Sequence, residues 1–431
     1  MGSPSFYYRR VHSLTFAIMK RIIVAIGATV CAYTTMFAAG FQTLEQGASN
    51  MGTAAAGATA NANADATAAF WNPSAGFNAG LEVGETKVDV GINVVLSVFD
   101  FNATSVTSVN PTLKPGKSGD AGCTSIVPNV FVLHRLTEDV MLTLSMTAPY
   151  ALETDYDENW VGRQMALNSN LTTLEFNPSL AYRINKYITI NGGISGQWLH
   201  ANLTSMPDFV NEYAVSGQSF SVGGNAGFTI NYAEDGRVGF QWRSEVCHDI
   251  AGNLNISGNV AKRIGCDLTL PQTFTVGWYQ RLRGDLKRFA VMVDYAYTMW
   301  SCFDNLYIYG KDGSGAVTNQ DESWRNTSRV CGGIHFFPLS NDDLVIRLGA
   351  AWDQTPIKDA QHRYARIPCT DRLWFCGGIG YKYGNFNIDI SYTYIYFLDD
   401  PEMNDVSYGT QLEGYFEGRA HVFAIQFGYK F

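Results

Sequence analysis

The 431-residue sequence is poor in charged residues and, beyond its N-terminal region, has no long apolar run. Asp, Glu, Lys and Arg make up 16% of the chain, against about 25% in typical soluble domains. After residue 40 no apolar run reaches the roughly 18 residues that a membrane-spanning helix needs. The net charge is −9 and no basic stripe is present, so we expect no nucleic-acid partner. These deficits argue against both ordinary soluble domains and a helical membrane protein.

Patterns typical of metal binding are also missing. No CxxC motif or Cys/His spacing suited to zinc occurs, and Cys369 and Cys376 stand seven residues apart. We therefore predict no metal site, and no motif in the sequence indicates a cofactor. The chain has 8 Cys, which we interpret as small apolar filler together with one or two loop disulfides.

The residues that are abundant are aromatic residues and glycine. Aromatics reach 13%, with 23 Tyr, 26 Phe and 9 Trp, and there are 42 Gly. Only helices and closed barrels satisfy every backbone hydrogen bond in lipid, so a charge-poor chain without spanning helices has one membrane architecture left. We therefore predict an all-β fold consisting of one large transmembrane antiparallel β-barrel.

The first 38 residues have the pattern of a secretory signal peptide. A basic pair and an apolar stretch over 22–37 precede small residues at 38–40. Met19 fits the start of this signal better than the first residue does, which would leave residues 1–18 upstream of the true start. The predicted signal peptide, residues 1–38, contains one of the 8 Cys. An odd number remains, so at least one thiol has no partner within the chain.

From about residue 86 the chain shows the period of two that is typical of strands. In the last segment Phe423 and Phe427 lie on one face, and Ala424 and Gln426 lie on the other. A soluble sandwich would show the same alternation. Segments of about 10–14 residues, aromatic residues at their ends and a chain that ends within a strand favour a membrane barrel instead.

The alternating segments number fourteen, and an even number places both ends of the barrel on one side of the membrane. They lie near 86–101, 124–136, 138–149, 171–185, 187–202, 216–232, 236–248, 271–284, 288–300, 326–338, 343–353, 371–383, 385–397 and 418–431. Long and short connections alternate between them. The long connections, predicted to be extracellular loops, are 102–123, 150–170, 203–215, 249–270, 301–325, 354–370 and 398–417.

Charged residues that the alternation turns inward are expected to pair across the lumen, because an unpaired buried charge is costly. The basic residues of this kind are Arg183, Arg347 and Arg372. Their candidate partners on other strands are Glu175, Asp294 and Asp389. We interpret these pairs as structural.

Residues 39–82 break the strand pattern. They are rich in Ala, Gly, Asn and Thr, a composition that is also typical of flexible linkers. Interspersed aromatic residues such as Phe41, Phe70 and Trp71 favour a compact plug inside the barrel instead. A fourteen-stranded barrel without a plug would enclose a sizeable aqueous lumen, because the diameter grows with strand number. We therefore divide the mature chain into a plug at 39–82 and a barrel at 83–431.

Several motifs in collinear order along the mature chain resemble those of a known family. AGFQ at 39–42, the EQGASNMGTAAAGA stretch from Glu45 and the triplet Asn72-Pro73-Ser74 are similar to an N-terminal hatch that usually ends in Asn-Pro-Ala. Other matching motifs are IVPNVFV at 126–132, ETDYDENWVGR at 153–163, FNPSLAYRIN at 176–185, WRSEV at 242–246, DLTLP at 267–271, AWDQTPI at 351–357 and RIPCTDRLW at 366–374. The chain thus resembles the FadL/TodX-type outer-membrane transporters of long-chain fatty acids and other hydrophobic molecules.

The resemblance implies a fourteen-stranded barrel in the bacterial outer membrane, with the plug as its hatch. It implies passive uptake of a long-chain fatty acid or a similar hydrophobic molecule. The substrate would be captured in an extracellular groove, enter an internal pocket and leave sideways into the membrane beside an inward-kinked third strand. We expect a monomer whose partners are this substrate and outer-membrane lipid. The barrel assembly machinery would recognise the C-terminal Phe431.

Position in the matched motifs assigns the candidate substrate-binding residues. Phe41 is expected to contact the substrate tail, with a packing role in the hatch as the alternative. Trp160 and Val161 would line an apolar groove, and Arg163 would lie on its rim, with a solvated loop arginine as the alternative. Arg325 precedes a barrel strand and is the best candidate to pair with a carboxylate.

Four further residues are assigned to the hatch and its gating. Asn72, Pro73 and Ser74 are predicted to form a turn, in which Pro fixes φ and Asn bonds the backbone. Pro149 cannot donate to a strand ladder. It marks either the kink with its lateral opening or simply the end of the third strand, and the pattern slightly favours the strand end.

Three other functions are weighed against fatty-acid transport. A transporter of aromatic hydrocarbons would share the fold, and the sequence contains no pocket shape that distinguishes the two. A general porin is disfavoured because the plug would block its open constriction. An outer-membrane lipid hydrolase needs Ser and His at a suitable spacing. No His residue beyond the signal peptide has that spacing, so we predict that the protein is not an enzyme.

Overall fold

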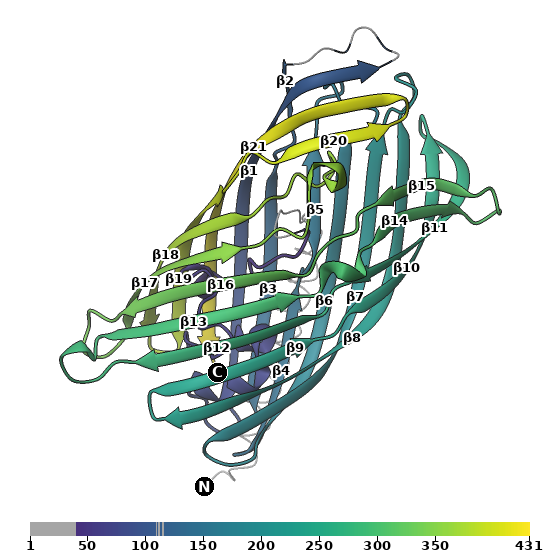
Figure 1. Cartoon of the computed structure of the whole chain (residues 1–431). Helices are drawn as coiled ribbons and strands as arrows, with labels where there is room; N and C mark the ends of the chain where they lie inside the picture. Colours follow the sequence, from purple (N-terminus) through teal and green to yellow (C-terminus); the bar gives the residue numbers. More distant parts are fainter. Residues whose placement is uncertain (1–39, 109, 111–112, 114–115) are drawn as a thin grey trace.

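The computed structural model describes residues 40–108, 110, 113 and 116–431. The predicted signal peptide at 1–38 lies outside this part of the chain. The described residues form one antiparallel sheet that is closed into a tall barrel, and the N-terminal segment lies inside it (Figure 1). In the part of the chain that the structure describes, no helix is long and apolar enough to cross a membrane.

The barrel closes through the first and last strands of the sheet. β1 (Thr86–Ser108) pairs with β21 (Thr410–Lys430) along almost the whole of both strands, from Lys87↔Lys430 to Ser108↔Thr410. Fourteen strands surround the lumen, which confirms the number predicted from the alternation. Closure leaves the first and last strands paired with each other rather than exposed as edges.

Three of the barrel strands are each divided into two segments. The barrel strands are, in order, β1, β3 (Thr124–Arg135), β4 (Val140–Thr147) continued by β5 (Ala151–Asp155), β6 (Asn168–Arg183), β7 (Ile188–Ser205), β8 (Tyr213–Ala233), β9 (Gly236–Arg243) continued by β10 (Val246–Ile256), β11 (Asn259–Leu270) continued by β12 (Thr273–Arg281), β13 (Phe289–Thr298), β16 (Thr327–Phe336), β17 (Leu344–Asp353), β18 (Arg372–Tyr383), β19 (Phe386–Phe397) and β21. Smaller elements are β2 (Gly116–Asp120), β14 (Asn305–Gly310), β15 (Ala316–Asp321), β20 (Glu402–Ser407), η2 (Gly284–Leu286), η3 (Trp300–Cys302) and η4 (Ala360–His362).

Several segments predicted to be long loops are strands instead. The segment at 249–270 belongs to β10 and β11, which form a hairpin whose turn at Ser257 and Gly258 has positive φ. The segments at 301–325 and 398–417 likewise contain β14, β15 and β20. At the end of the barrel formed by these segments, the apolar face of a strand turns inward and the polar face turns outward. In β10, for example, Ile250 is buried and Asp249 is exposed. The hydrophobic pattern therefore reverses, and the prediction based on an apolar outer face was wrong there.

The alternation predicted for the membrane wall is confirmed in the last strand. Phe423 and Phe427 are 50% and 56% exposed on the outer face, whereas Ala424 and Gln426 are buried on the inner face. The same outward arrangement holds for Phe386 in β19. The barrel thus presents an apolar surface to lipid and encloses a polar lumen.

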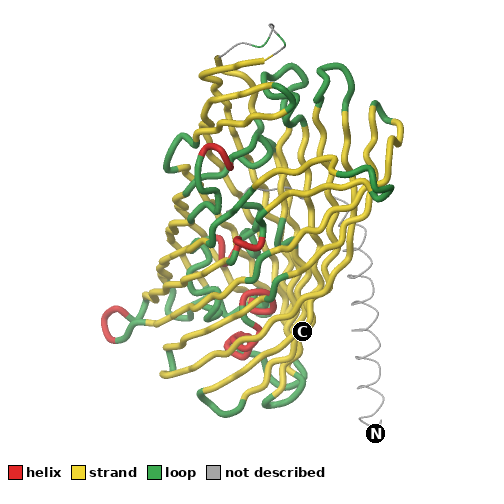
Figure 2. The backbone as a smooth tube through the Cα atoms, turned by 45° about the vertical axis from the view of Figure 1, so that its right-hand side comes forward, coloured by secondary structure: helices red, strands yellow, loops and turns green. Residues whose placement is uncertain are grey.

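The N-terminal segment at 40–82, which we call the hatch, is packed inside the wall. Its helical turns are α2 (Ala48–Met51), α3 (Ala68–Trp71) and η1 (Pro73–Ala79), and Figure 2 shows them enclosed by the strands. A Cβ added at Gly349 would lie 2.4 Å from the backbone of Thr53, and one at Gly239 would lie 2.1 Å from the Thr59 carbonyl oxygen. Bare backbone on the wall therefore permits the hatch to pack against it.

Charged side chains of the wall bind backbone groups of the hatch. The Asp294 carboxylate accepts hydrogen bonds from the amides of Gly57 (2.5 Å) and Thr59 (3.0 Å). Arg237 donates to the carbonyl oxygen of Ala60 (2.5 Å), and Arg329 donates to that of Ala54 (2.8 Å). The irregular hatch backbone thus finds in the wall the partners that it lacks within itself.

The predicted pairing of inward charges is confirmed for one pair. Arg347 on β17 lies 2.7 Å from Asp389 on β19, and both side chains are buried. Arg372 on β18 pairs instead with Asp353 on β17, also at 2.7 Å. Both pairs lie on the lumen wall, as the alternation indicated.

The remaining inward charges have partners that the alternation could not predict. Arg183 lies over the ring of Phe77 in the hatch, 4.2 Å from its centroid, and forms no predicted ion pair. Glu175 pairs with Arg243, and Asp294 binds the hatch backbone. The predicted partners of all three were wrong. Arg183 and Asp294 contact the hatch, whose conformation the strand pattern does not describe, and Glu175 pairs with another residue of the wall.

We expect Asp294→Ala to loosen the hatch without unfolding the barrel. The substitution removes two charge-assisted hydrogen bonds, each worth about 1.5–3 kcal/mol. Single-channel conductance in planar bilayers should rise above that of the wild type. Asp267→Ala, which removes a carboxylate from the exposed face of β11, is the matched control. Equal conductance in all three proteins would contradict an anchoring role for Asp294.

Candidate functional site

The described chain forms three spaces above and around the hatch. An apolar cavity lies between β5, β6, β7, β10, β11 and β14. A vestibule lies at the end of the barrel with the long connections and shares Leu203, Val215 and Arg366 with the apolar cavity. A lumen cavity lies on the other side of the first hatch residues. The start of the hatch therefore stands between the lumen cavity and the other two spaces.

The walls of the apolar cavity consist of aliphatic side chains on the inner faces of strands. Leu152, Leu171, Ile250, Ile264 and Leu268 are among them. Their apolar faces point inward at the level where the outer faces are polar, which is the reversed alternation described above. The cavity can thus bury a hydrocarbon chain, at a gain of about 0.8 kcal/mol per CH₂ group.

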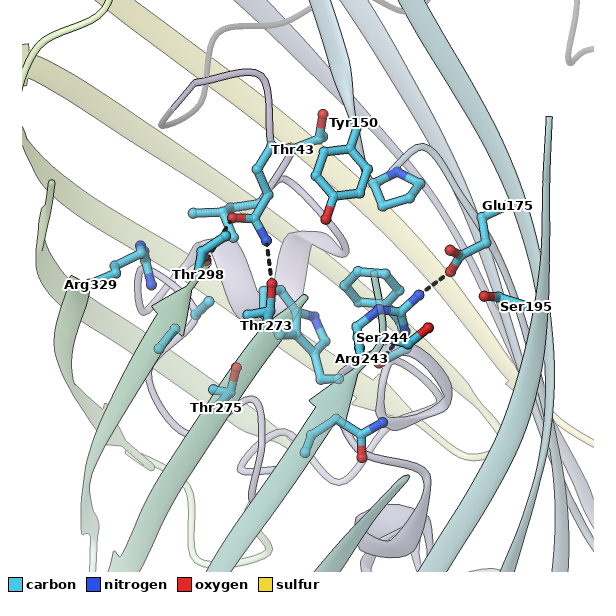
Figure 3. A pocket seen from close by; sticks show the side chains of 18 of the residues that line it. Thr43, Tyr150, Glu175, Ser195, Arg243, Ser244, Thr273, Thr275, Thr298 and Arg329 are labelled. Carbon is cyan, nitrogen blue, oxygen red and sulfur yellow. Dashed lines mark hydrogen bonds and ion pairs between the residues drawn. The ribbon is translucent and has the colours of Figure 1, made fainter. Parts of the chain in front are cut away.

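The lumen cavity is polar and lies between the hatch and the wall (Figure 3). Glu175, Arg243, Asp294 and Arg329 contribute charged groups to its lining, and Tyr150 stands at its upper end. These four charged groups are paired with each other or with the hatch backbone.

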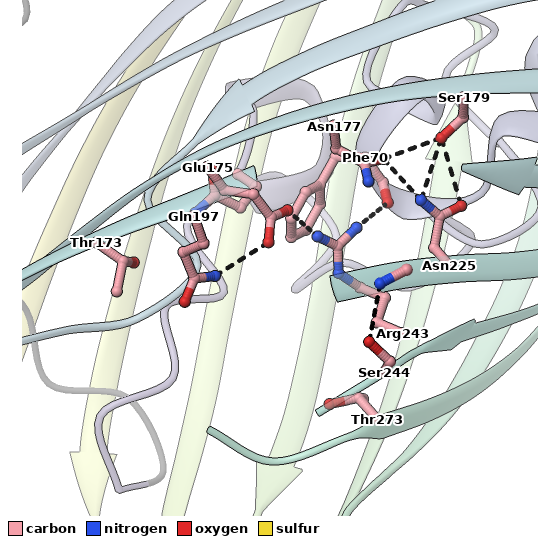
Figure 4. A network of polar contacts seen from close by, with 12 residues as sticks. Phe70, Thr173, Glu175, Asn177, Ser179, Gln197, Asn225, Arg243, Ser244 and Thr273 are labelled. Atoms are coloured by element: carbon pink, nitrogen blue, oxygen red, sulfur yellow. Dashed lines mark hydrogen bonds and ion pairs between the residues drawn. The ribbon is translucent and has the colours of Figure 1, made fainter. Parts of the chain in front are cut away.

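Figure 4 shows how one of these charge pairs connects the wall to the hatch. Arg243 forms an ion pair with Glu175, and its guanidinium lies 4.5 Å from the centroid of the Phe70 ring in the hatch. Gln197 donates to the other oxygen of Glu175 at 3.0 Å, and its Oε1 accepts from His248 Nε2 at 3.0 Å. The network fixes the side chains that separate the lumen cavity from the strands behind it.

Phe41 lies at the partition between the apolar cavity and the lumen cavity. It is 2% exposed and lies within a cluster of four aromatic rings, with centroid distances of 4.8–6.2 Å. The members of this cluster are Tyr150, Trp300, Phe303 and Trp324. Phe41 lines the apolar cavity, whereas the next residues, Gln42 and Thr43, line the lumen cavity.

The same hatch residues are hydrogen bonded to a break in the third barrel strand. The Thr43 amide donates to the carbonyl oxygen of Pro149 (2.8 Å), and the Ala151 amide donates to that of Phe41 (2.9 Å). Pro149 lies between β4 and β5, both of which pair with β6. The strand therefore resumes after Pro149, and the interpretation of this residue as a strand end was wrong. The start of the hatch occupies the place of the missing ladder.

Arg366 brings a positive charge to the junction of the apolar cavity and the vestibule. Its guanidinium donates to the Ser169 hydroxyl (3.0 Å) and to the Asn168 carbonyl oxygen (3.3 Å). Burial lowers the pKa of Arg366 to about 10, so the group is still cationic at neutral pH. Its hydrogen bonds go to neutral oxygens, and the Asp405 carboxylate in the vestibule wall is close enough to favour its charged form.

Glu322 also lines the apolar cavity, and it is almost completely buried. The indole nitrogen of Trp324 donates to its carboxyl group at 3.0 Å. Burial raises the pKa of Glu322 to about 8, with a contribution from the nearby Asp321 and Asp405 carboxylates. Glu322 is therefore mainly neutral at pH 7, and the net charge of the cavity wall is positive.

The structure places the predicted groove residues away from the three spaces. Trp160 is buried and stacks on Tyr156 with a centroid distance of 3.9 Å, and Val161 beside it is buried as well. Arg163 donates to the Trp160 carbonyl oxygen (3.3 Å) and lies 5.1 Å from the Phe209 ring centroid. These side chains pack the loop between β5 and β6.

Arg325 forms a hydrogen bond and an ion pair with other residues of the chain. Its guanidinium donates to the Thr355 carbonyl oxygen (3.2 Å) and lies 3.8 Å from the Asp371 carboxylate. It lines neither the apolar cavity nor the vestibule among the described residues. Arg366, within the RIPCTDRLW motif, was missed as a candidate. Most arginines in loops are exposed to solvent, and nothing in the sequence indicates that this one is buried.

Asn72, Pro73 and Ser74 lie far down the hatch against β8. The Asn72 side-chain oxygen accepts from the Ser74 amide (3.3 Å), and Pro73 begins η1. The Asn72 amide group donates to the carbonyl oxygens of Thr59 (2.8 Å) and Phe228 (3.2 Å). The triplet thus forms a turn that connects two parts of the hatch to the wall.

Seven Cys lie in the described part of the chain, and all seven are free thiols. Four of them, Cys266, Cys331, Cys369 and Cys376, are buried. The buried thiols agree with the interpretation of Cys as apolar filler, whereas the one or two expected loop disulfides are not formed among the described residues.

Comparison with known proteins points to a single family. A family model described as "Outer membrane protein transport protein (OMPP1/FadL/TodX)" matches residues 29–431. The "Long-chain fatty acid transport protein" of Salmonella typhi is 23% identical over 366 residues, which cover 76% of this chain and 81% of that protein. "Outer membrane protein P1" of Haemophilus influenzae is 26% identical over 405 residues, which cover 83% and 86%.

Solved structures have the same fold. A Pseudomonas aeruginosa FadL homologue superposes with a TM-score of 0.80 at 20% identity and covers 91% of this chain and 99% of that one. The CymD monoaromatic hydrocarbon channel superposes with a TM-score of 0.62 at 17% identity, with the same coverage. Because the family model spans nearly the whole sequence, this chain belongs to the OMPP1/FadL/TodX family of transport proteins of the bacterial outer membrane.

Proposed function

We propose that the protein takes up long-chain fatty acids by passive diffusion across the outer membrane. Membership of its family makes it a transporter of hydrophobic compounds, and fatty acids are the class that its cavities suit best. The observation that carries this choice is Arg366 at the mouth of a mainly apolar cavity. A hydrocarbon chain would fill the cavity, and its carboxylate would pair with the guanidinium.

The vestibule would capture the substrate and pass it to the apolar cavity. The two spaces are continuous, and the vestibule lining is mixed in polarity, which suits an amphiphile that arrives from water. An unpaired buried carboxylate is costly. Arg366 therefore allows the head group to remain charged while the tail leaves the water.

The start of the hatch would act as the gate between the cavities. Phe41 forms the floor of the apolar cavity, so a substrate tail that reaches the floor would contact this ring. Release of Phe41 from its aromatic cluster would open the partition and free the break in the third strand beside Pro149. Lateral exit into the membrane would then follow at this break. Asn72, Pro73 and Ser74 would limit the movement to the first part of the hatch.

Aromatic hydrocarbons are the second candidate class. The cluster around Phe41 offers ring edges and faces, and Glu322 is mainly neutral at pH 7. A molecule such as toluene has no head group and would make no use of Arg366. The contribution of Arg366 to binding therefore distinguishes fatty acids from aromatic hydrocarbons as the substrate class.

Uptake of labelled oleate by cells that lack their own fatty-acid transporter tests the proposal directly. Expression of the wild-type chain should restore oleate uptake, and deletion of residues 41–74 should abolish this uptake. Heat-modifiable electrophoretic mobility would verify that each barrel is folded in the outer membrane. A folded wild-type barrel without oleate uptake would exclude fatty acids and direct the assay to labelled toluene.

Arg366→Ala should weaken oleate binding to the purified protein by about 10-fold or more, because a hydrogen-bonded charge pair is lost. Toluene binding should be unchanged. Arg163→Ala and Arg325→Ala are the comparison variants, since the sequence motifs predict these residues as carboxylate partners. A loss of oleate affinity in either of them, with Arg366→Ala unaffected, would favour the motif-based assignment over Arg366.

Oleate affinity should fall as the pH rises through about 8, where Glu322 loses its proton. The deprotonated form adds a negative charge to the cavity that receives a carboxylate, whereas the carboxyl group of oleate, with a pKa near 4–5, is ionised throughout this range. The dissociation constant measured at pH 7 and pH 9 should therefore differ in the wild type. Glu322→Gln should remove this difference, and an identical pH dependence in the variant would refute the role of Glu322.

A further inference from the structure

The wall between β8 and the strand formed by β9 and β10 is not continuously paired. β8 pairs with β9 as far as Asn225↔Arg243, and pairing with β10 begins only at Gln218↔Ala251. Residues 219–224 of β8 and 244–250 of the opposite strand lie between these two ladders. We call this interval the seam.

A β-bulge accounts for the seam. The register of the two ladders differs by one residue, so the strand of β9 and β10 contains one residue more than β8. The extra residue lies at Ser244–Glu245, where β9 ends and β10 begins. Bulges of this kind bend a strand and interrupt its pairing, and they are frequent beside functional sites in barrels.

Side-chain hydroxyls replace part of the missing ladder. The Gly224 amide donates to the Ser244 hydroxyl (2.8 Å), and the Ser244 amide donates to the Gly224 carbonyl oxygen (2.8 Å). The Ser221 hydroxyl donates to the Cys247 carbonyl oxygen (2.5 Å). Rotation of the Ser221 or Ser244 side chain releases its hydroxyl bond without moving the strand, which leaves the backbone bond from the Ser244 amide to Gly224 to be broken. The seam therefore opens at lower cost than a regular ladder.

The seam lies between the lumen cavity and an apolar outer surface. Ser195, Gly224, Ser244 and Val246 line the lumen cavity at this point. On the outer face Val222 is 65% exposed, and Ile194, which pairs with Gly224, is 67% exposed. A ligand in the lumen cavity would therefore lie against the inner side of the seam, whose outer side faces the lipid.

We propose that the seam is a second lateral passage, through which the hydrocarbon chain of a transported compound moves between the lumen cavity and the bilayer. The lumen cavity also reaches Pro149 at the break in the third strand. One cavity thus touches the wall at two interruptions on different strands. The hatch occupies the first interruption, and serine hydroxyls bridge the second, so the two passages open through different movements. This inference rests on the proposed transport function.

Gly224→Leu tests the seam by placing a bulky side chain at its outer edge. A Cβ at Gly224 would come no nearer than 3.4 Å to another atom, and one at Gly192 no nearer than 3.9 Å. Gly192→Leu on β7 is therefore a matched control on the same outer face, paired within regular ladders. We expect Gly224→Leu to lower the initial rate of oleate uptake and Gly192→Leu to leave it unchanged.

A reversible cross-link gives a second test. If the register of the β8–β10 ladder is continued into the seam, Val222 lies opposite the native Cys247. Both residues are exposed on the outer face. Oxidation of Val222→Cys should close the seam with a disulfide and reduce uptake, and a reductant should restore it. The double variant Val222→Cys, Cys247→Ser cannot form this bond and should be insensitive to oxidation.

The outcomes separate the seam from the proposed function. Wild-type uptake together with unchanged rates in Gly224→Leu and in the cross-linked protein overturns the seam and leaves fatty-acid transport intact. If the wild-type barrel is folded and takes up no oleate, transport of fatty acids itself is wrong. Loss of uptake in Gly224→Leu or on cross-linking, with both controls at the wild-type rate, supports the seam.

Discussion

The need to pair every backbone amide and carbonyl group within the bilayer determines this structure, because no water is available there to take the place of a partner. Closure of β1 on β21 meets that need around the barrel. Where a ladder is interrupted, another group must supply the bonds. Hatch residues Phe41 and Thr43 do so at the break in the third strand, and Ser221 and Ser244 do so beside β8. The places with substitute partners are the two places where we propose that the wall opens, because a substitute bond can be released without unpairing a regular ladder.

Most of the barrel could be predicted from the sequence because lipid imposes a simple rule on each strand. Segments with an apolar outer face, such as the one containing Phe423 and Phe427, were recognised correctly. Beyond the membrane the rule reverses, because water is outside and the apolar cavity is inside. The hairpin of β10 and β11, with Ile250 inward and Asp249 outward, was therefore interpreted as a loop. A search for inverted alternation next to a membrane segment would have found it.

The site was less predictable than the wall, since its residues are defined by contacts between distant segments. Phe41 and Pro149 were selected from motif position, and the structure brings them together through backbone bonds that no local pattern specifies. Arg366 and Glu322 occur in irregular segments, where a charged residue usually means exposure to water. Only the fold reveals that both line an apolar cavity. Trp160 shows the opposite error, in which a packing residue was predicted to bind substrate. An aromatic side chain in a loop can serve packing as readily as binding, and the sequence does not distinguish the two.

The position of the hatch has a consequence for the order of biogenesis. The hatch precedes β1 in the chain, yet it contacts both strands that close the barrel: the Ala66 amide donates to Asp89 on β1, and Gln426 on β21 donates to Asp65. The closing pair joins opposite ends of the sequence and therefore carries a large loop-closure entropy. A hatch that contacts both strands would hold β1 and β21 side by side and lower this cost, so the segment that we propose as the gate of the finished barrel would first serve as an internal template for its closure.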